Sequence, residues 1–118
     1  MTDQRSQFIS IAPLVPTGVS LSEAVSYYTE QLGFVVEWTG GSMAGIRRGA
    51  IVLNLVENDS KEWIENSSYS IGVSNLDALY EEYRKALVKV TPPEVKFWGR
   101  REFHMIAPSG VCFQFYQQ

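Results

Sequence analysis

The chain has 118 residues, of which 45% are hydrophobic and 19% charged, which describes one globular domain and excludes a disordered segment. Its 10 basic and 13 acidic residues give a net charge of −3, which argues against nucleic acid as a partner and mildly favours a cationic ligand. The single cysteine, Cys112, cannot form an intrachain disulfide. The chain also lacks a signal-peptide core and any apolar run of the roughly 20 residues that span a membrane, so we expect a cytoplasmic domain with no membrane partner.

The first half of the chain predicts a strand, a helix and three further strands. An apolar stretch over residues 8–15, interrupted by Pro13, indicates the first strand. Ser20 or Ser22 can cap the helix that follows, whose apolar residues recur at helical spacing until Gly33 ends it. Strands are then expected over residues 34–38, 43–48 and 51–57.

The second half repeats this order after a polar connector over residues 58–67, which contains Trp63. A strand is expected over residues 69–73, and Asn75 opens a helix that continues to about Val88. The last three strands are expected over residues 94–98, 102–107 and 111–117. The sequence therefore predicts the order β-α-β-β-β twice.

An internal repeat supports this duplication. Adding 60 to the residue number places Trp38 on Trp98 and Ile46 on Ile106, and it aligns residues 50–57 with residues 110–117. Each aligned segment begins with a small residue and carries one central amide, Asn54 or Gln114, within an alternating apolar strand. We interpret residues 1–118 as a single domain built from module one, about residues 7–57, and module two, about residues 68–118.

Several segments resemble the vicinal oxygen chelate superfamily, which groups glyoxalases, bleomycin resistance proteins and extradiol dioxygenases. They are Val25-Ser-Tyr-Tyr-Thr-Glu-Gln-Leu-Gly-Phe34, Val73-Ser-Asn-Leu-Asp-Ala-Leu-Tyr80, Trp98-Gly-Arg-Arg-Glu-Phe103 and Ala107-Pro-Ser-Gly110. The third is typical of the bleomycin-resistance branch. The resemblance implies an α+β fold of two βαβββ modules in tandem, whose mixed, strongly curved sheets form a cup. It also implies a homodimer.

Enzymes of this superfamily hold a divalent metal with side chains from the first and last strands of each module. Carried onto this chain, those positions fall near Ser10 and Ser68 and at Asn54 and Gln114. None is His or Glu, and neutral amides are weak ligands for a divalent ion. The only imidazole of the chain, that of His104, lies on the penultimate strand. We therefore expect no metal and no other cofactor.

Other side chains of the expected cup are candidates for binding a ligand. Trp38 and Trp98 offer planar rings on which an aromatic ligand can stack, although they can equally cap the core or fill a dimer contact. The amides of Asn54 and Gln114 need partners, which a ligand, water or a neighbouring strand can supply. The predicted ligand-binding residues are Trp38, Asn54, Trp98, Arg101, His104, Gln114 and Tyr116.

Two further roles concern His104 and Trp63. His104 shares a strand face with Glu102 and could act as a general base, although a structural histidine is commoner. Trp63 in a polar connector could close over a ligand or a protein partner. Cys112 is expected to be a buried small hydrophobe rather than a nucleophile.

These observations favour a binding protein over an enzyme. The preferred hypothesis is a metal-independent protein that, like bleomycin resistance proteins, sequesters a drug or metabolite in a dimer groove. Such a protein confers antibiotic resistance without chemistry, and its ligand would be aromatic or cationic. The alternatives are a metal-free lyase or isomerase that uses His104 as its acid–base group, and a regulatory or immunity module that binds another protein.

Overall fold

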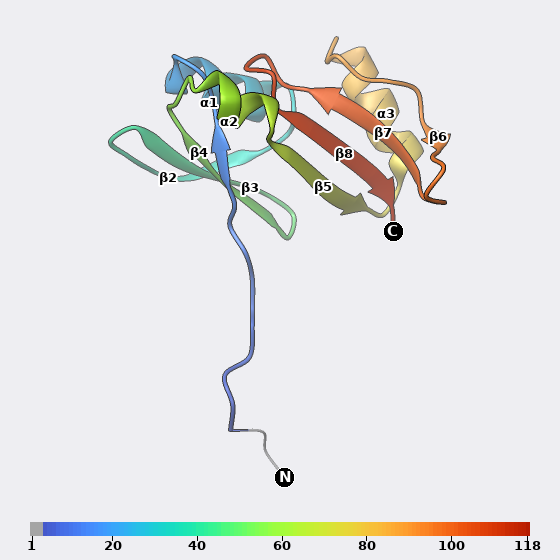
Figure 1. Cartoon of the computed structure of the whole chain (residues 1–118), viewed down its shortest axis with the longest axis horizontal. Coiled ribbons are helices and arrows are strands. Elements are labelled where there is room, and N and C mark those ends of the chain that lie inside the picture. The colour runs from blue at the N-terminus through green and yellow to red at the C-terminus, as the bar shows by residue number, and fades with distance from the viewer. Residues whose placement is uncertain (1–3) are drawn as a thin grey trace.

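We describe residues 4–118 of a computed structural model of the chain. Two modules of the order β-α-β-β-β follow one another, with a short helix between them (Figure 1). The elements are β1 (Leu14–Pro16), α1 (Leu21–Glu30), β2 (Val35–Gly40), β3 (Met43–Arg48), β4 (Ile51–Val56), α2 (Lys61–Glu65), β5 (Ser68–Val73), α3 (Leu76–Lys85), β6 (Glu94–Val95), β7 (Arg101–Ile106) and β8 (Cys112–Gln117). The predicted α+β order is thus confirmed.

The two long helices begin where their capping residues predict. The Ser20 hydroxyl accepts a hydrogen bond from the backbone N–H of Glu23 at 3.2 Å, and the Asn75 side chain accepts one from Ala78 at 3.0 Å. Gly33, with a φ of 82°, lets the chain turn from α1 towards β2, since this left-handed backbone is strained for other residues. Helix α3 ends at Lys85, three residues before the expected end at Val88.

Each module contributes one four-stranded mixed sheet, in the orders β1-β4-β3-β2 and β5-β8-β7-β6. The first strand of each module runs parallel to the last, and the other pairs are antiparallel. The inner edge strands β1 and β5 face one another, and the Tyr69 hydroxyl of β5 donates a hydrogen bond to the Leu14 carbonyl of β1 at 2.6 Å. Strands β2 and β6 consequently lie at the two outer edges of the molecule (Figure 1).

One apolar core joins the two modules. Alternating residues of the strands are buried beneath the helices, and the largest of them in module two are Phe103, Met105, Phe113 and Phe115. Tyr28 of α1 packs edge-on against Phe113 of β8, with 6.1 Å between the ring centroids. The modules therefore share buried area within one chain.

An ion pair and a tyrosine reinforce this junction. The Arg48 guanidinium at the end of β3 donates to both carboxylate oxygens of Glu82 on α3, at 2.8 and 2.9 Å. The same Arg48 and the Tyr83 hydroxyl both donate to the Leu32 carbonyl at the end of α1. These contacts tie the turn after α1 to α3 of the other module.

Three expectations about local structure are wrong. The first strand covers only Leu14–Pro16, and residues 4–13 extend away from both sheets (Figure 1). The connector contains helix α2, which carries a partly buried Trp63 and so is not an open loop. Strand β6 has two residues, and residues 96–100 form a turn in which the Gly99 N–H donates to the Lys96 carbonyl at 2.8 Å.

The expected strong curvature is also absent, because neither sheet curls far enough to form a cup by itself (Figure 1). Strands β1 and β6 pair over three and two residues, so each sheet has only three full-length strands. Three long strands twist, but they do not wrap around a cavity. No helix within residues 4–118 is long and apolar enough to cross a membrane.

Candidate functional site

The candidate site lies on the open face of module two, which we define as the sheet face turned away from α3. Helix α3 covers the opposite face, where Tyr80 contacts Phe103 and Tyr83 contacts Phe115. Because strand side chains alternate between faces, the neighbours of those phenylalanines point to the open face. They are Glu102, His104 and Ile106 on β7 and Cys112, Gln114 and Tyr116 on β8.

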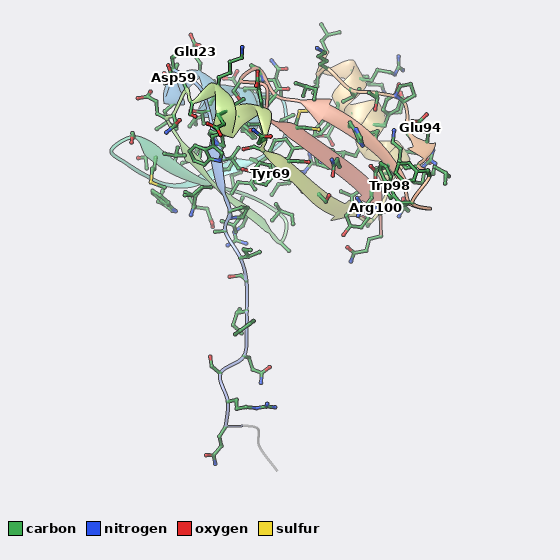
Figure 2. All side chains as sticks on the ribbon, in the orientation of Figure 1. Glu23, Asp59, Tyr69, Glu94, Trp98 and Arg100 are labelled. Atoms are coloured by element: carbon green, nitrogen blue, oxygen red, sulfur yellow. The ribbon has the colours of Figure 1, made fainter. Side chains whose placement is uncertain are left out.

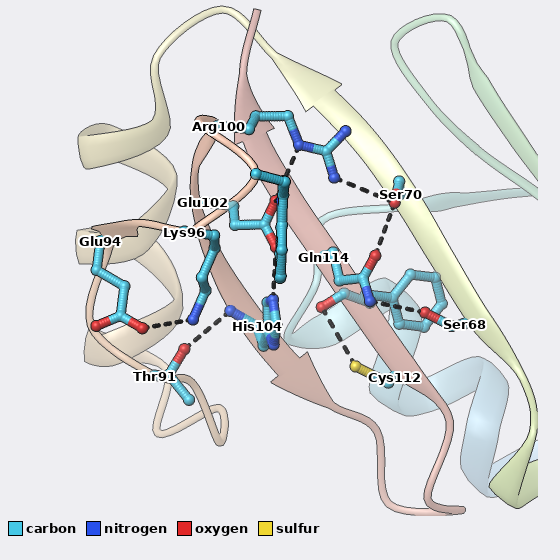
Figure 3. A network of polar contacts seen from close by, with 12 residues as sticks. Ser68, Ser70, Thr91, Glu94, Lys96, Arg100, Glu102, His104, Cys112 and Gln114 are labelled. Carbon is cyan, nitrogen blue, oxygen red and sulfur yellow. Dashed lines mark hydrogen bonds and ion pairs between the residues drawn. The ribbon is translucent and has the colours of Figure 1, made fainter.

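A buried carboxylate organises this face. The Glu102 side chain is 0% exposed, and both of its oxygens accept hydrogen bonds. Oε2 accepts from the Trp98 indole Nε1 at 3.2 Å and from the Arg100 Nε at 2.9 Å, while Oε1 lies 2.7 Å from the His104 Nε2 (Figure 3). Buried carboxylates are rare unless paired in this way, so Glu102 fixes three side chains at once.

The hydrogen bonds also determine the charge of Glu102. Removal from water would raise the pKa of this carboxyl, but the donors on His104, Arg100 and Trp98 outweigh that effect and hold the pKa below its ordinary value. Glu102 is therefore ionised at neutral pH. A fixed negative charge beneath the face explains why a tryptophan and an arginine converge on it from the β6–β7 turn.

Trp98 and Arg100 leave that turn side by side (Figure 2). The indole keeps one edge on Glu102 and remains 50% exposed, so its ring is both held and accessible. The Arg100 guanidinium carbon lies 4.0 Å from the ring centroid of Tyr116, a cation–π contact. We call Trp98, Arg100 and Tyr116 the platform, because two aromatic rings and one guanidinium are held together here by these contacts.

A ladder of neutral polar groups continues the platform towards β5. The Gln114 side chain donates to the Ser68 hydroxyl at 2.9 Å and accepts from the Ser70 hydroxyl at 2.7 Å (Figure 3). Arg100 reaches the same Ser70 hydroxyl at 3.5 Å. The neighbouring strand, one of the partners anticipated from the sequence, thus satisfies the amide of Gln114.

The open face of module one carries a second aromatic site. Trp38 of β2 lies opposite Gly45 of β3, and Gly45 lies opposite Asn54 of β4. A Cβ atom on Gly45 would stand 2.5 Å from Cε2 of Trp38, so the indole lies directly on the glycine backbone. Absence of a side chain at residue 45 therefore determines where Trp38 can rest.

The structure brings only some of the predicted residues together. Trp98, His104, Gln114 and Tyr116 share the open face of module two, whereas Trp38 and Asn54 lie on the other sheet. Arg101 does not join either group: its Nη2 donates to Asp77 on the first turn of α3 at 2.8 Å, on the helix side of the sheet. Trp38 and Trp98 are not equivalent in backbone structure either, since one is in a strand and the other in a turn.

Sequence reasoning missed Ser70 and the two glycines under the aromatic rings, and it considered Arg100 only as a contact for an anionic ligand, without placing it in the predicted site. Gly72 stands opposite Tyr116, and a Cβ at Gly72 would approach Cζ of that ring to 3.0 Å. Sequence reasoning named Glu102 only as a partner of His104. The spacing shows more, because the side chains of Trp98, Arg100 and His104 all lie within four residues of the Glu102 carboxylate in the sequence. That spacing is the signal that could have identified it.

The superfamily positions for a metal do not fit an ion here. Ser10 lies in the extended, exposed N-terminal segment, and Gln114 and Ser68 are hydrogen-bonded to each other. Within residues 4–118 no three side chains of His, Cys, Asp or Glu gather as they would to hold a metal. The two hydroxyls of Ser10 and Ser68 and the two neutral amides of Asn54 and Gln114 lack the charge and the imidazole nitrogen that such a site requires.

Two hollows of the single chain lie away from the open faces. One of about 660 Å³ separates α1 from the turn around Pro108, and one of about 480 Å³ lies between the modules beside Arg48 and Glu82. The platform around Trp98 is by contrast an open surface.

Comparison with known proteins identifies the family to which this fold belongs. The model of the Glyoxalase/Bleomycin resistance protein/Dioxygenase superfamily matches residues 16–115. The chain belongs to this superfamily. No curated protein sequence matches it.

Solved structures within the superfamily share the fold. A bleomycin-binding protein from bleomycin-producing Streptomyces verticillus, complexed with copper(II)-bleomycin, is 28% identical with a TM-score of 0.86, covering 97% of this chain and 99% of that one. A bleomycin-binding protein complexed with bleomycin is 17% identical with a TM-score of 0.85, covering 94% and 99% of the two chains. A bleomycin resistance determinant encoded on the transposon Tn5 is 17% identical with a TM-score of 0.84, covering 94% and 98%.

Proposed function

We propose that this protein binds a small aromatic molecule without a metal and sequesters it in a groove between two protomers. The observation that carries the proposal is the Trp98 indole, half exposed and yet fixed by the buried carboxylate of Glu102. A large exposed aromatic ring costs free energy in water, and hydrogen bonding that holds it rigid removes the entropy cost of ordering it on binding. The likeness to bleomycin-binding proteins supports the same function.

The charges on the face allow a cationic ligand without requiring one. Arg100 and Lys96 balance Glu102 and Glu94, and Glu94 bonds Lys96 at 2.5 Å. Recognition therefore depends on ring stacking and hydrogen bonds more than on net charge.

The dimer accounts for apolar surface that a single chain leaves in water. Phe8 is 104% exposed, and Ile9 and Ile11 of the same extended segment are exposed with it. Val35 and Trp38 on the outer edge strand β2 are also exposed. Contiguous exposed apolar residues are typical of protein interfaces, and a second protomer can cover them.

A titration with metal-free bleomycin, the ligand named for the relatives, tests binding. We expect saturable quenching of tryptophan fluorescence, and Trp98→Ala should weaken binding roughly tenfold because the stacking surface is lost. Trp63→Ala, on helix α2, is the matched control and should bind as the wild type does. Equal affinity of Trp98→Ala and wild type would contradict the assignment of the platform, and a stoichiometric divalent metal in the purified protein would contradict metal independence.

The dimer groove has its own test, since Trp38 lies on the edge strand β2 and Trp98 lies in the turn after the opposite edge strand β6 of the same chain. If each groove combines Trp38 of one protomer with Trp98 of the other, a mixed dimer of Trp38→Ala and Trp98→Ala chains contains one intact groove and one empty groove. Purified heterodimer should therefore show half of the wild-type binding stoichiometry, whereas the homodimers of either variant should bind weakly. No recovery in a mixture that native mass spectrometry shows to be heterodimeric would contradict the shared groove.

A second candidate is catalysis by His104, favoured by the 2.7 Å contact of its ring with Glu102. This pair resembles the orienting acid–base pairs of hydrolases and isomerases. It predicts a turnover that His104→Ala abolishes while affinity for the substrate survives. If His104→Ala leaves any observed turnover intact, the acid–base role is excluded.

A further inference from the structure

We propose that Glu102 is the positioning residue of the open face. It makes Nδ1 of His104 a hydrogen-bond acceptor that recognises a donor on the ligand. The inference rests on the proposed function and narrows its ligand class. The molecule that fits is flat, stacks on Trp98, and carries an N–H or O–H donor at its edge, as amides and amino-substituted heteroaromatic rings do.

The three hydrogen bonds of Glu102 determine which of the bonded atoms carry protons. An indole N–H and a guanidinium N–H can only donate, so Oε2 must be an acceptor towards Trp98 and Arg100. Oε1 is then the oxygen that could carry a proton, and among residues 4–118 its hydrogen-bond partner is the His104 Nε2. The two obligate donors on Oε2 and the neighbouring Arg100 charge favour the ionised carboxylate, which lowers the pKa of Glu102, so the proton of the contact with His104 belongs to the imidazole.

The consequence falls on the other ring nitrogen. In neutral imidazole one nitrogen donates and the other accepts, and the partner of the first fixes the role of the second. Since Nε2 donates to Glu102, Nδ1 of neutral His104 is an acceptor. Among residues 4–118 the hydrogen bonds of the ring involve only Nε2, and the side chain is 26% exposed. Nδ1 is therefore available to accept a hydrogen bond from a ligand.

Neighbouring groups keep the ring in place without competing for Nδ1. The backbone N–H of His104 donates to the Thr91 hydroxyl at 2.9 Å, and across the strand pair Gln114 is already bonded to Ser68 and Ser70 (Figure 3). Lys96 is bonded to Glu94. His104 thus presents an acceptor beside the Trp98 platform for which no hydrogen-bond partner is recorded among residues 4–118.

Glu102→Gln isolates this role, because glutamine keeps the shape of glutamate and changes one atom. Its carbonyl oxygen can still accept from Trp98 and Arg100, which places its NH₂ group against Nε2 of His104. Nε2 must then accept, and the imidazole proton moves to Nδ1. The substitution therefore turns the acceptor presented to the ligand into a donor while the indole stays where it was.

Nitrogen-15 NMR in mildly alkaline buffer reads this change directly, because the chain has a single histidine and its ring signals need no assignment. We expect the Nε2–H tautomer in the wild type and the Nδ1–H tautomer in Glu102→Gln, with the Trp98 indole signal retained. Glu94→Gln, across the β6–β7 pair from Glu102, is the matched control and should leave the tautomer unchanged. An Nδ1–H tautomer in the wild type would overturn the proposal even if no variant folds.

Affinity for metal-free bleomycin completes the test. Glu102→Gln should weaken binding roughly tenfold, since a donor then faces a donor, and Glu94→Gln should not weaken it. A changed tautomer with unchanged affinity would show that the ligand does not use Nδ1, which overturns the proposal. If the wild type does not bind the probe, the proposed function fails for that ligand, while the tautomer still decides whether Glu102 positions His104.

Discussion

Substitution of Gly45 by alanine tests whether the backbone of β3 holds Trp38 in a binding position. A Cβ at residue 45 would lie 2.5 Å from Cε2 and 2.6 Å from Cδ1 of the indole. Carbon atoms pack at about 3.5–4.0 Å, so the ring must move by roughly 1 Å or rotate off the sheet. Trp38 is 44% exposed, so the ring can move into solvent without disturbing the core.

The expected result is a loss of affinity with little loss of stability. Displacing one stacking ring should weaken ligand binding by about 2- to 10-fold, which corresponds to about 0.5–1.5 kcal/mol. The free energy of unfolding should stay within about 1 kcal/mol of wild type, because alanine is favoured over glycine in a strand. Gly40→Ala is the matched control, since a Cβ at this position of β2 meets nothing within 4 Å.

Isothermal titration with metal-free bleomycin and urea denaturation measure the two quantities, and the Trp38 indole NMR signal reports the displacement. Wild-type affinity in Gly45→Ala, together with weakened binding in Trp38→Ala, would refute the idea that Gly45 positions the ring. Wild-type affinity in both variants would instead remove Trp38 from the groove.

Four further substitutions test the core and the network by their free energies of unfolding. Tyr28→Phe should raise stability by about 1 kcal/mol in urea denaturation, because the buried Tyr28 hydroxyl has no hydrogen-bond partner in residues 4–118, and a loss of stability would show that a partner exists. Phe113→Ala should cost about 3–5 kcal/mol through the cavity it leaves in the shared core, and a cost below 1 kcal/mol would contradict the burial. Arg48→Lys should cost roughly 1 kcal/mol, because lysine cannot bond both oxygens of Glu82, and an unchanged midpoint would show that the junction does not depend on this pair. The lowered pKa of Glu102 stabilises the folded state at pH values above the unfolded carboxyl pKa of about 4.3, and this stabilisation is lost as the pH falls below that value. Acid titration should therefore narrow the difference in unfolding free energy between wild type and Glu102→Gln. A constant difference would contradict the pKa shift.

The fold was predictable because local signals agree with one another. Ser20, Gly33 and Asn75 each mark a helix boundary by a separate physical cause, and the alternation of apolar residues identifies β4 and β8. The offset of 60 holds between β4 and β8, where the buried Leu53 and Leu55 correspond to the buried Phe113 and Phe115. Between β3 and β7 it is wrong by one residue, because Ile46 corresponds in strand pairing to Met105 and Ile106 points to the open face. The alternation of apolar residues therefore predicts the buried positions where the backbone is a regular strand.

The same offset failed at the tryptophans because the backbone there is irregular. Gly99 has a φ of 90°, and the turn around it takes residues 96–100 out of the strand that periodicity predicts. Trp98 and Arg100 consequently reach over the sheet from a turn, whereas Arg101 begins β7 on the helix side. Two adjacent arginines thus have opposite environments, which agrees with the alternation of side chains along β7 when it is continued back from Glu102.

The open faces explain why the site divides between the modules. The two modules share an order of strands but carry different side chains on their open faces. Module two places a charged and hydrogen-bonded platform on Glu102, whereas module one places Trp38 on the bare backbone of Gly45. One ring is held by polar contacts and the other by the absence of a side chain. A flat ligand bound between them would meet one surface that selects by hydrogen bonds and one that selects only by shape, so its specificity would depend mainly on module two.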